Sequence, residues 1–173
     1  MMEQYVVIGK FVSTFGVKGE LILQHHLGED VDPSSLKIFF LEELGGKFLP
    51  YFISSAKIKN EKELLVVLEG IDTPEKGKKL LKKQVWLPEL EVKSQASASA
   101  PIALLGFEVY DKKKLLGKVL EVIEQPMQIL LRVDFNKKEV YVPLNESTLI
   151  KIDHKKEKIN VELPEGLLDI YIN

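Results

Sequence analysis

The stretch Val7-Ile8-Gly9-Lys10-Phe11-Val12-Ser13-Thr14-Phe15-Gly16-Val17-Lys18-Gly19-Glu20 decides how this chain folds. As an extended strand its first part puts Val6, Ile8 and Lys10 on one face and Val7, Gly9 and Phe11 on the other. Two glycines then bracket Val17 and Lys18, and an apolar run resumes at Leu21. Glycine allows the positive φ of a tight reversal, and such a reversal lifts the lysine into solvent. The pattern predicts a β-hairpin.

Further short segments rich in β-branched and aromatic residues follow this hairpin. Turn residues such as Gly45-Gly46 and the polar stretch Lys59–Lys62 separate them, as is typical of β-strands. The strands expected before the first helix are Tyr5–Thr14, Glu20–Leu27, Leu36–Leu41, Phe48–Lys59 and Glu63–Leu68, and Gln84–Leu87 is expected after it. The five strands before the helix favour a small barrel over an open sandwich, and the sequence leaves closure of the barrel open.

One short helix interrupts the strands. Thr73 suits the N-cap and Pro74 suits the first helical position, where its missing N–H costs nothing. The lysines of this segment could touch phosphate, but a charge run on a short helix is more often a solvated face, and we expect the solvated face. Trp86 is expected in the barrel core or at its rim.

The segment from Pro88 to Pro101 has the composition of a linker. Its part Ser94-Gln95-Ala96-Ser97-Ala98-Ser99-Ala100 is uncharged and holds no large apolar side chain to bury. We therefore expect a flexible joint over residues 91–101 between a first domain, 1–90, and a second, 102–173.

The second half again reads as short strands joined by charged turns. The expected strands are Gly106–Tyr110, Gly117–Gln125, Ile129–Asp134, Glu139–Pro143, Leu149–Asp153 and Lys158–Glu162, and a short turn or helix follows Pro164-Glu165-Gly166. The fold class is therefore mostly all-β, with two small β-barrel domains.

The composition restricts the classes of function that this chain can have. The chain has 173 residues, 45% of them hydrophobic, and a formal net charge of −2. A protein that held RNA mainly by neutralising phosphates would be strongly basic, so this charge argues against a nonspecific RNA binder and suits a basic protein partner. The absence of cysteine excludes disulfides and thiolate sites. With no apparent leader or long apolar run, a soluble, cytoplasmic protein without membrane contact is expected.

No catalytic or metal-binding set is evident. His25 and His26 are neighbours and would point to opposite faces of a strand, and His154 lies in a lysine-rich turn. Gly16–Gly19 lacks the spacing of a phosphate-binding Walker loop and precedes a strand. We expect no enzyme, no metal and no cofactor.

The order of several motifs resembles a known family over nearly the whole chain. Ile8-Gly9-Lys10, Phe15-Gly16-Val17-Lys18-Gly19-Glu20-Leu21 and Glu69-Gly70-Ile71-Asp72-Thr73-Pro74-Glu75 are similar to the N-terminal domain of the ribosome maturation factor RimM. Leu104-Leu105-Gly106-Phe107-Glu108-Val109 and Leu115-Leu116-Gly117-Lys118-Val119 are similar to the opening of that family's second domain, a PRC-barrel. Val140-Tyr141-Val142-Pro143-Leu144 and the stretch Val161–Asp169 resemble its close.

The resemblance implies a non-enzymatic assembly factor. Such a factor binds the head of the immature small ribosomal subunit, and processing of 16S rRNA depends on it indirectly. The implied partners are the head protein numbered nineteen and the 3′ domain of 16S rRNA, and we expect the factor itself to be a monomer. By resemblance, the ribosome-binding residues are Phe15, Gly16, Val17, Lys18 and Gly19. The partner-protein residues are Leu104, Leu105, Gly106 and Phe107.

One departure from the family pattern concerns the start of the second domain. The family usually carries an aromatic pair shortly before Leu104-Leu105-Gly106, and this chain has Ser99 and Ala100 there. Phe107 and Tyr110 are the nearby aromatic candidates for a partner contact. The alternative function is that of an adaptor or regulatory binding protein unrelated to ribosomes, since PRC-barrels serve in that role as well.

Overall fold

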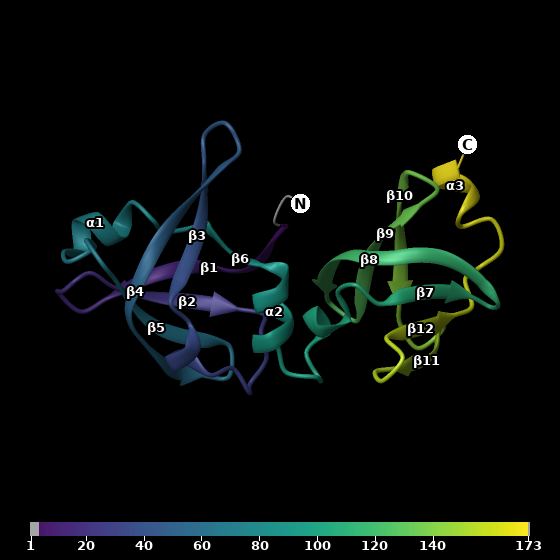
Figure 1. Ribbon diagram of the computed structural model, residues 1–173, viewed down its shortest axis with the longest axis horizontal. Helices are drawn as coiled ribbons and strands as arrows, with labels where there is room; N and C mark the ends of the chain where they lie inside the picture. The colour runs from purple at the N-terminus through teal and green to yellow at the C-terminus, as the bar shows by residue number, and fades with distance from the viewer. Residues whose placement is uncertain (1–3, 173) are drawn as a thin grey trace. The chain divides into compact units, whose positions relative to one another are not determined.

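The computed structural model describes residues 4–172 and divides into two compact units, Met1–Ala103 and Leu104–Asn173 (Figure 1). All twelve strands expected from the sequence are present, with ends that shift by a few residues. The chain is therefore mostly β, as predicted.

Six antiparallel strands close the first unit into a barrel, in the order β1-β2-β5-β4-β3-β6 (Figure 1). The strands are β1 (Tyr5–Phe15), β2 (Glu20–His25), β3 (Ile38–Glu43), β4 (Lys47–Asn60), β5 (Glu63–Leu68) and β6 (Gln84–Pro88). Closure leaves no free sheet edge between β1 and β6, which pair from Tyr5 opposite Pro88 to Lys10 opposite Gln84. The predicted first barrel is confirmed.

Large apolar side chains fill the barrel. Phe11 and Phe39 are fully buried, with ring centroids 6.4 Å apart in an edge-on arrangement. Strand β5 shows the simple alternation, since Leu64, Val66 and Leu68 point inward and the residues between them do not. Each such side chain contributes about 1.5 to 3 kcal/mol when taken fully out of water.

Strand β1 does not keep the alternation expected from its sequence. Ile8 and Phe11 are both fully buried, although strict alternation puts them on opposite faces. The register shifts between Val7 and Gly9 against β6, and a bulge of this kind moves the following residues to the other face. Gly9 permits the close approach, because a Cβ there would overlap the backbone oxygen of Gln24 on β2.

The first helix begins as the sequence predicts. Helix α1 (Pro74–Lys78) has Thr73 as its N-cap, whose hydroxyl accepts a 3.2 Å hydrogen bond from the Lys76 N–H. Leu80 is buried just beyond the helix end, so this side of the segment is fixed to the barrel.

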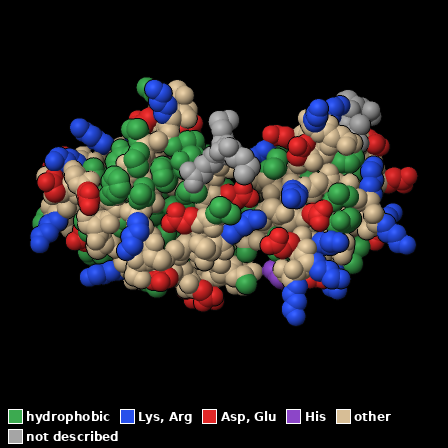
Figure 2. Space-filling view, in the orientation of Figure 1, with side chains coloured by type: hydrophobic (Ala, Val, Ile, Leu, Met, Phe, Trp, Pro, Cys, Tyr) green, Lys and Arg blue, Asp and Glu red, His purple; other side chains and the backbone are tan. Residues whose placement is uncertain are grey.

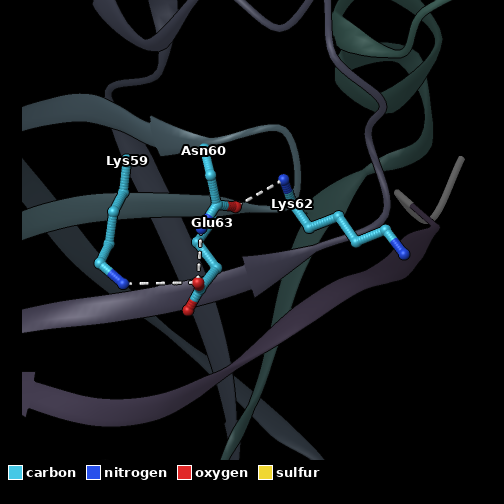
Figure 3. A network of polar contacts seen from close by, with 4 residues as sticks. All are labelled: Lys59, Asn60, Lys62 and Glu63. Carbon is cyan, nitrogen blue, oxygen red and sulfur yellow. Dashed lines mark hydrogen bonds and ion pairs between the residues drawn. The ribbon is translucent and has the colours of Figure 1, made fainter.

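The β4–β5 reversal is the polar hairpin turn that the sequence indicates (Figure 3). The Asn60 amide donates a 2.7 Å hydrogen bond to Glu63, and its oxygen accepts one of 2.9 Å from the Lys62 N–H. The hydrogen bond from Asn60 and the nearby Lys59 hold the pKa of Glu63 below its ordinary value.

The expected linker is not an unstructured joint. Residues Glu89–Gln95 form helix α2, and Val92 in that helix is fully buried. Ser97 is buried too: its N–H donates to the carbonyl of Leu27, and its hydroxyl accepts a 2.8 Å bond from the Asp30 N–H. Small residues were expected to have nothing to bury, but here they fit a tight contact with the first barrel, next to Gly28. The compact first unit runs to Ala103.

The second unit is a six-stranded sheet in the order β10-β9-β8-β7-β12-β11. The strands are β7 (Glu108–Asp111), β8 (Lys114–Gln125), β9 (Gln128–Phe135), β10 (Lys138–Leu144), β11 (Leu149–Asp153) and β12 (Lys158–Val161). Strands β7 and β12 run parallel, which joins the beginning of the unit to its end, and the other pairs are antiparallel. Buried side chains from five strands, such as Val109, Leu131 and Val142, form one core.

A short C-terminal helix, α3 (Asp169–Ile172), follows the last strand, close to where a turn or helix is expected. The ring of Tyr171 lies 6.3 Å from that of Tyr141 on β10. The end of the described chain therefore returns to the sheet of its own unit.

Candidate ribosome-binding loop and its supports

The candidate loop lies between β1 and β2 and presents its side chains to solvent. Phe15 is 49% exposed and Val17 is 80% exposed, and Lys18 is exposed beside them. Exposed large apolar side chains next to a cation are typical of contact surfaces. Of the five residues expected at this site, only Gly19 is buried.

Gly19 ties the loop to the segment in front of α1. A Cβ on Gly19 would stand 2.5 Å from the carbonyl oxygen of Ile71 and 2.8 Å from the backbone nitrogen of Thr73. Both loop glycines take positive φ, +69° at Gly16 and +79° at Gly19, as the sequence predicts. Gly16 has open space around it, so only Gly19 is held by packing.

Helix α1 and the turn after it brace the same end of the barrel. Gly77 packs against Thr14 and Leu21, since a Cβ there would stand 3.1 Å from the Thr14 methyl. Beyond the helix, the Lys82 N–H donates to the carbonyl of Phe11, and the Phe11 N–H donates to that of Lys83, at 2.8 and 3.2 Å. The loop thus rests on a support that hydrogen bonds and packing hold in place.

Positive charge predominates at this support. Lys76 lies 2.9 Å from Asp72, and this ion pair holds the pKa of the Asp72 carboxyl below its ordinary value. Lys83 lies 3.5 Å from Glu43. Lys78, Lys79 and Lys82 are exposed as well.

Three of the four candidates in the second set are buried in the core of their unit. Leu104, Leu105 and Phe107 are each at most 5% exposed, and Gly106 has a φ of +80°. Their side chains therefore hold the local fold and offer little surface for contact. Phe107 packs edge-on against His154, 5.8 Å between centroids, and Tyr110 lies under the Lys158 ammonium at 5.3 Å.

Two family models match the chain, one for each unit. The RimM N-terminal domain matches residues 6–92, and the RimM PRC barrel domain matches residues 101–167. The chain belongs to the RimM family of ribosome maturation factors. The interval between the two RimM matches contains Ser97 and Ser99, part of the serine–alanine stretch.

Curated relatives extend this match to the full length. The ribosome maturation factor RimM of Parabacteroides distasonis is 30% identical over 97% of this chain and 98% of its own. That of Aquifex aeolicus is 32% identical over 98% of this chain and all of its own. The solution structure of the RimM N-terminal domain from Thermus thermophilus covers 50% of this chain and 92% of its own, at 20% identity and a TM-score of 0.38.

Ser99 and Ala100, which stand where an aromatic pair is expected for the family, differ in exposure. Ser99 is exposed, but Ala100 is 8% exposed and packs close to Gly28. A large ring at Ala100 would need the surrounding side chains to move.

Sequence reasoning missed an aromatic cluster on the outside of the RimM N-terminal barrel. Tyr5 stacks on Phe48 at 4.5 Å and approaches Phe40 at 4.8 Å, and Phe48 meets Trp86 edge-on at 5.0 Å. These four residues come from strands β1, β3, β4 and β6. Figure 2 shows an apolar area over this part of the barrel. The signal was the pair Phe39-Phe40: on a strand, one ring must face inward and the other outward. Trp86, expected in the core or at the rim, is half-buried between the buried Val85 and Leu87 and therefore lies on the outer face.

The adjacent histidines His25 and His26 differ in burial, as the sequence predicts for neighbours on a strand. His25 is 4% exposed and His26 is exposed, so they face opposite sides of the chain. The His25 Nδ1 accepts a 3.1 Å hydrogen bond from the Leu27 N–H, and burial lowers the pKa of this imidazole. Within residues 4–172, no group of three or more His, Asp or Glu side chains could hold a metal ion, and no helix is long and apolar enough to cross a membrane.

Proposed function

We propose that this protein is a non-enzymatic assembly factor that binds the head of the immature small ribosomal subunit, promotes its maturation and 16S rRNA processing, and leaves the mature particle. Family membership supports a role in ribosome maturation. The head, the 3′ domain of 16S rRNA and the head protein numbered nineteen as partners belong to the proposal, as do the cytoplasmic location and the monomeric state.

The observation that carries the proposal is the exposed loop Phe15–Lys18 on its fixed base at Gly19. A loop held in one conformation loses little entropy on binding. Its apolar side chains can be desolvated against a partner, while Lys18 can approach phosphate or a carboxylate. We assign ribosome binding to Phe15, Gly16, Val17, Lys18 and Gly19 on this basis.

The proposal gives the second unit the contact with the basic head protein. The buried side chains of Leu104, Leu105 and Phe107 would act indirectly, because they fix the strands whose surface residues contact the head protein. The formal net charge of −2 favours encounter with a basic protein.

Sedimentation of a cell extract through a sucrose gradient tests the proposal. We expect the protein in the fractions of free and immature small subunits and not with translating ribosomes. Absence from every ribosomal fraction would contradict the proposal and favour an adaptor role for the PRC-barrel.

A further inference from the structure

The segment from Pro74 to Lys83 concentrates positive charge in a chain that is negative overall. Its ten residues hold five lysines and a single acid, Glu75, whereas the whole chain has a formal net charge of −2. A charge run on a short helix is more often a solvated face, so the composition alone does not decide between that reading and a binding surface. The distribution therefore calls for a test of what this segment could bind.

The backbone that carries these lysines is fixed. Leu80 is buried, Gly77 packs on the barrel, and Lys82 and Lys83 exchange backbone hydrogen bonds with Phe11. Lys82 also has a φ of +71°, in the left-handed region that glycine adopts more easily. A lysine at such a position places its charge on a rigid turn at some cost to the fold.

Several of the lysines lack an intramolecular partner. Lys76 is paired with Asp72 and Lys83 with Glu43. No acidic side chain in the described part of the chain forms an ion pair with Lys78, Lys79 or Lys82, nor with Lys18.

The contact between Gly19 and Ile71–Thr73 brings the loop that carries Lys18 next to this segment. Figure 2 shows lysine side chains projecting from the end of the barrel where α1 lies. We call Lys18, Lys78, Lys79 and Lys82 the lysine ridge.

We propose that the lysine ridge binds the phosphate backbone of structured RNA. Exposed lysines without an ion-pair partner, on a backbone held in place, suit a repeating row of phosphates, each of which releases counterions when it is neutralised. Such a contact positions the protein on RNA without reading bases. The inference rests on the proposed function for the identity of the RNA and adds a binding element beyond the loop itself.

Lys82→Gly gives a sharp test, because glycine removes the charge and relieves the positive φ. The probe is a fluorescent transcript of the 16S rRNA 3′ domain, and the affinity of the full chain is measured between about 50 and 200 mM salt. We expect Lys82→Gly to weaken binding about three- to tenfold and to reduce the slope of log affinity against log salt by about 0.7 to 1. Its thermal stability should equal or exceed that of the unaltered chain.

Lys137→Gly is the matched control, since Lys137 is an exposed lysine with a φ of +66° at a hairpin turn of the second unit. It should leave the affinity and the salt slope unchanged. The double variant Lys78→Gln with Lys79→Gln should lower the slope further than Lys82→Gly does.

Three results would overturn the inference. They are an unchanged affinity for Lys82→Gly, an equal loss for Lys137→Gly, and equal competition by poly-glutamate, which would make the ridge a general polyanion site. If the chain sediments with immature subunits yet fails to bind the transcript, the ridge is wrong while the proposed function stands. If ridge-dependent RNA binding occurs without sedimentation on any subunit, the ridge stands and the proposed function fails.

Discussion

Gly19 lies so close to Ile71 that a Cβ on the glycine would stand 2.5 Å from the Ile71 carbonyl oxygen. This contact joins the β1–β2 loop to the turn before α1, two segments about fifty residues apart in the chain. Two of the sequence motifs that resemble the N-terminal domain of the family, Phe15–Leu21 and Glu69–Glu75, are therefore in contact.

The two loop glycines should therefore differ in their tolerance of a methyl group. Gly16→Ala meets open space and should cost about 1 kcal/mol for its positive φ alone. Gly19→Ala adds a backbone clash and should cost about 2 to 4 kcal/mol. Urea unfolding of the two variants measures the difference. Equal costs would show that the Gly19–Ile71 contact does not hold the loop.

Lys18→Ala should separate function from stability. The side chain is exposed, so the free energy of unfolding should change by less than about 0.5 kcal/mol. Association with immature small subunits should weaken, and the loss should be larger at low salt, where charges are less screened. Thermal unfolding and subunit binding are both measured; a variant that unfolds early would make the lysine structural.

The stability of the first unit should depend on residues beyond position 90. A fragment of residues 1–103 keeps Val92 and the Ser97 contacts, whereas a fragment of residues 1–90 loses them. Loss of one fully buried valine and one buried hydrogen-bonded group predicts a deficit of about 2 to 4 kcal/mol. Thermal and urea unfolding of both fragments test this. If the two fragments were equally stable, residues 91–101 would contribute nothing to the first unit and would act only as a linker.

Ser97→Ala is a finer test of the same contact. It removes the acceptor of the Asp30 N–H and should cost about 1 to 2 kcal/mol. Ser99→Ala is the matched control, because Ser99 is exposed in the same serine–alanine stretch. Limited proteolysis should cut the Ser97→Ala variant faster in this stretch than either the unaltered chain or the control, and equal cutting rates would contradict the contact.

His25 should make the first unit sensitive to acid. Burial, with a smaller contribution from His26, holds the folded-state pKa of His25 below the ordinary 6.5, so the unfolded chain takes up the proton more readily. The contribution to stability is complete above pH 6.5 and is lost as the pH falls below it, by at most about 1.4 kcal/mol per pH unit for one proton.

His25→Asn should flatten that dependence, because the Asn oxygen can replace Nδ1 as acceptor for the Leu27 N–H. His26→Asn, at the exposed neighbour, should retain it. Unfolding free energies measured from about pH 5 to 8 distinguish the two; an unchanged slope in His25→Asn would mean that another group titrates.

The sequence was most informative where structure is local. The turn glycines Gly16 and Gly19, the Thr73 cap and the strand Glu63–Leu68 depend on neighbours in the chain, and all were predicted correctly. Alternation failed in β1 because a bulge is set by the partner strands, not by β1 itself.

Long-range packing accounts for the remaining differences. Nothing local in the serine–alanine stretch indicates that Ser97 meets Leu27 and Asp30. For the candidate sites, the exposed loop at Val17 was found from its glycines, but burial of Leu105 and Phe107 depends on the folded core.

One measurement tests the central claim most directly, namely that the β1–β2 loop contacts the head of the immature small subunit. The chain has no cysteine, so Val17→Cys introduces a single labelling site at an 80% exposed position. Leu44→Cys, at the 98% exposed tip of the β3–β4 hairpin, is the control. With a thiol-linked photo-crosslinker and purified immature small subunits, the account predicts crosslinks from position 17 to the 16S rRNA 3′ domain or the head protein numbered nineteen, in excess of those from position 44. The account would be contradicted if position 17 crosslinked only to the body of the subunit. It would also be contradicted if position 44 formed crosslinks and position 17 formed none.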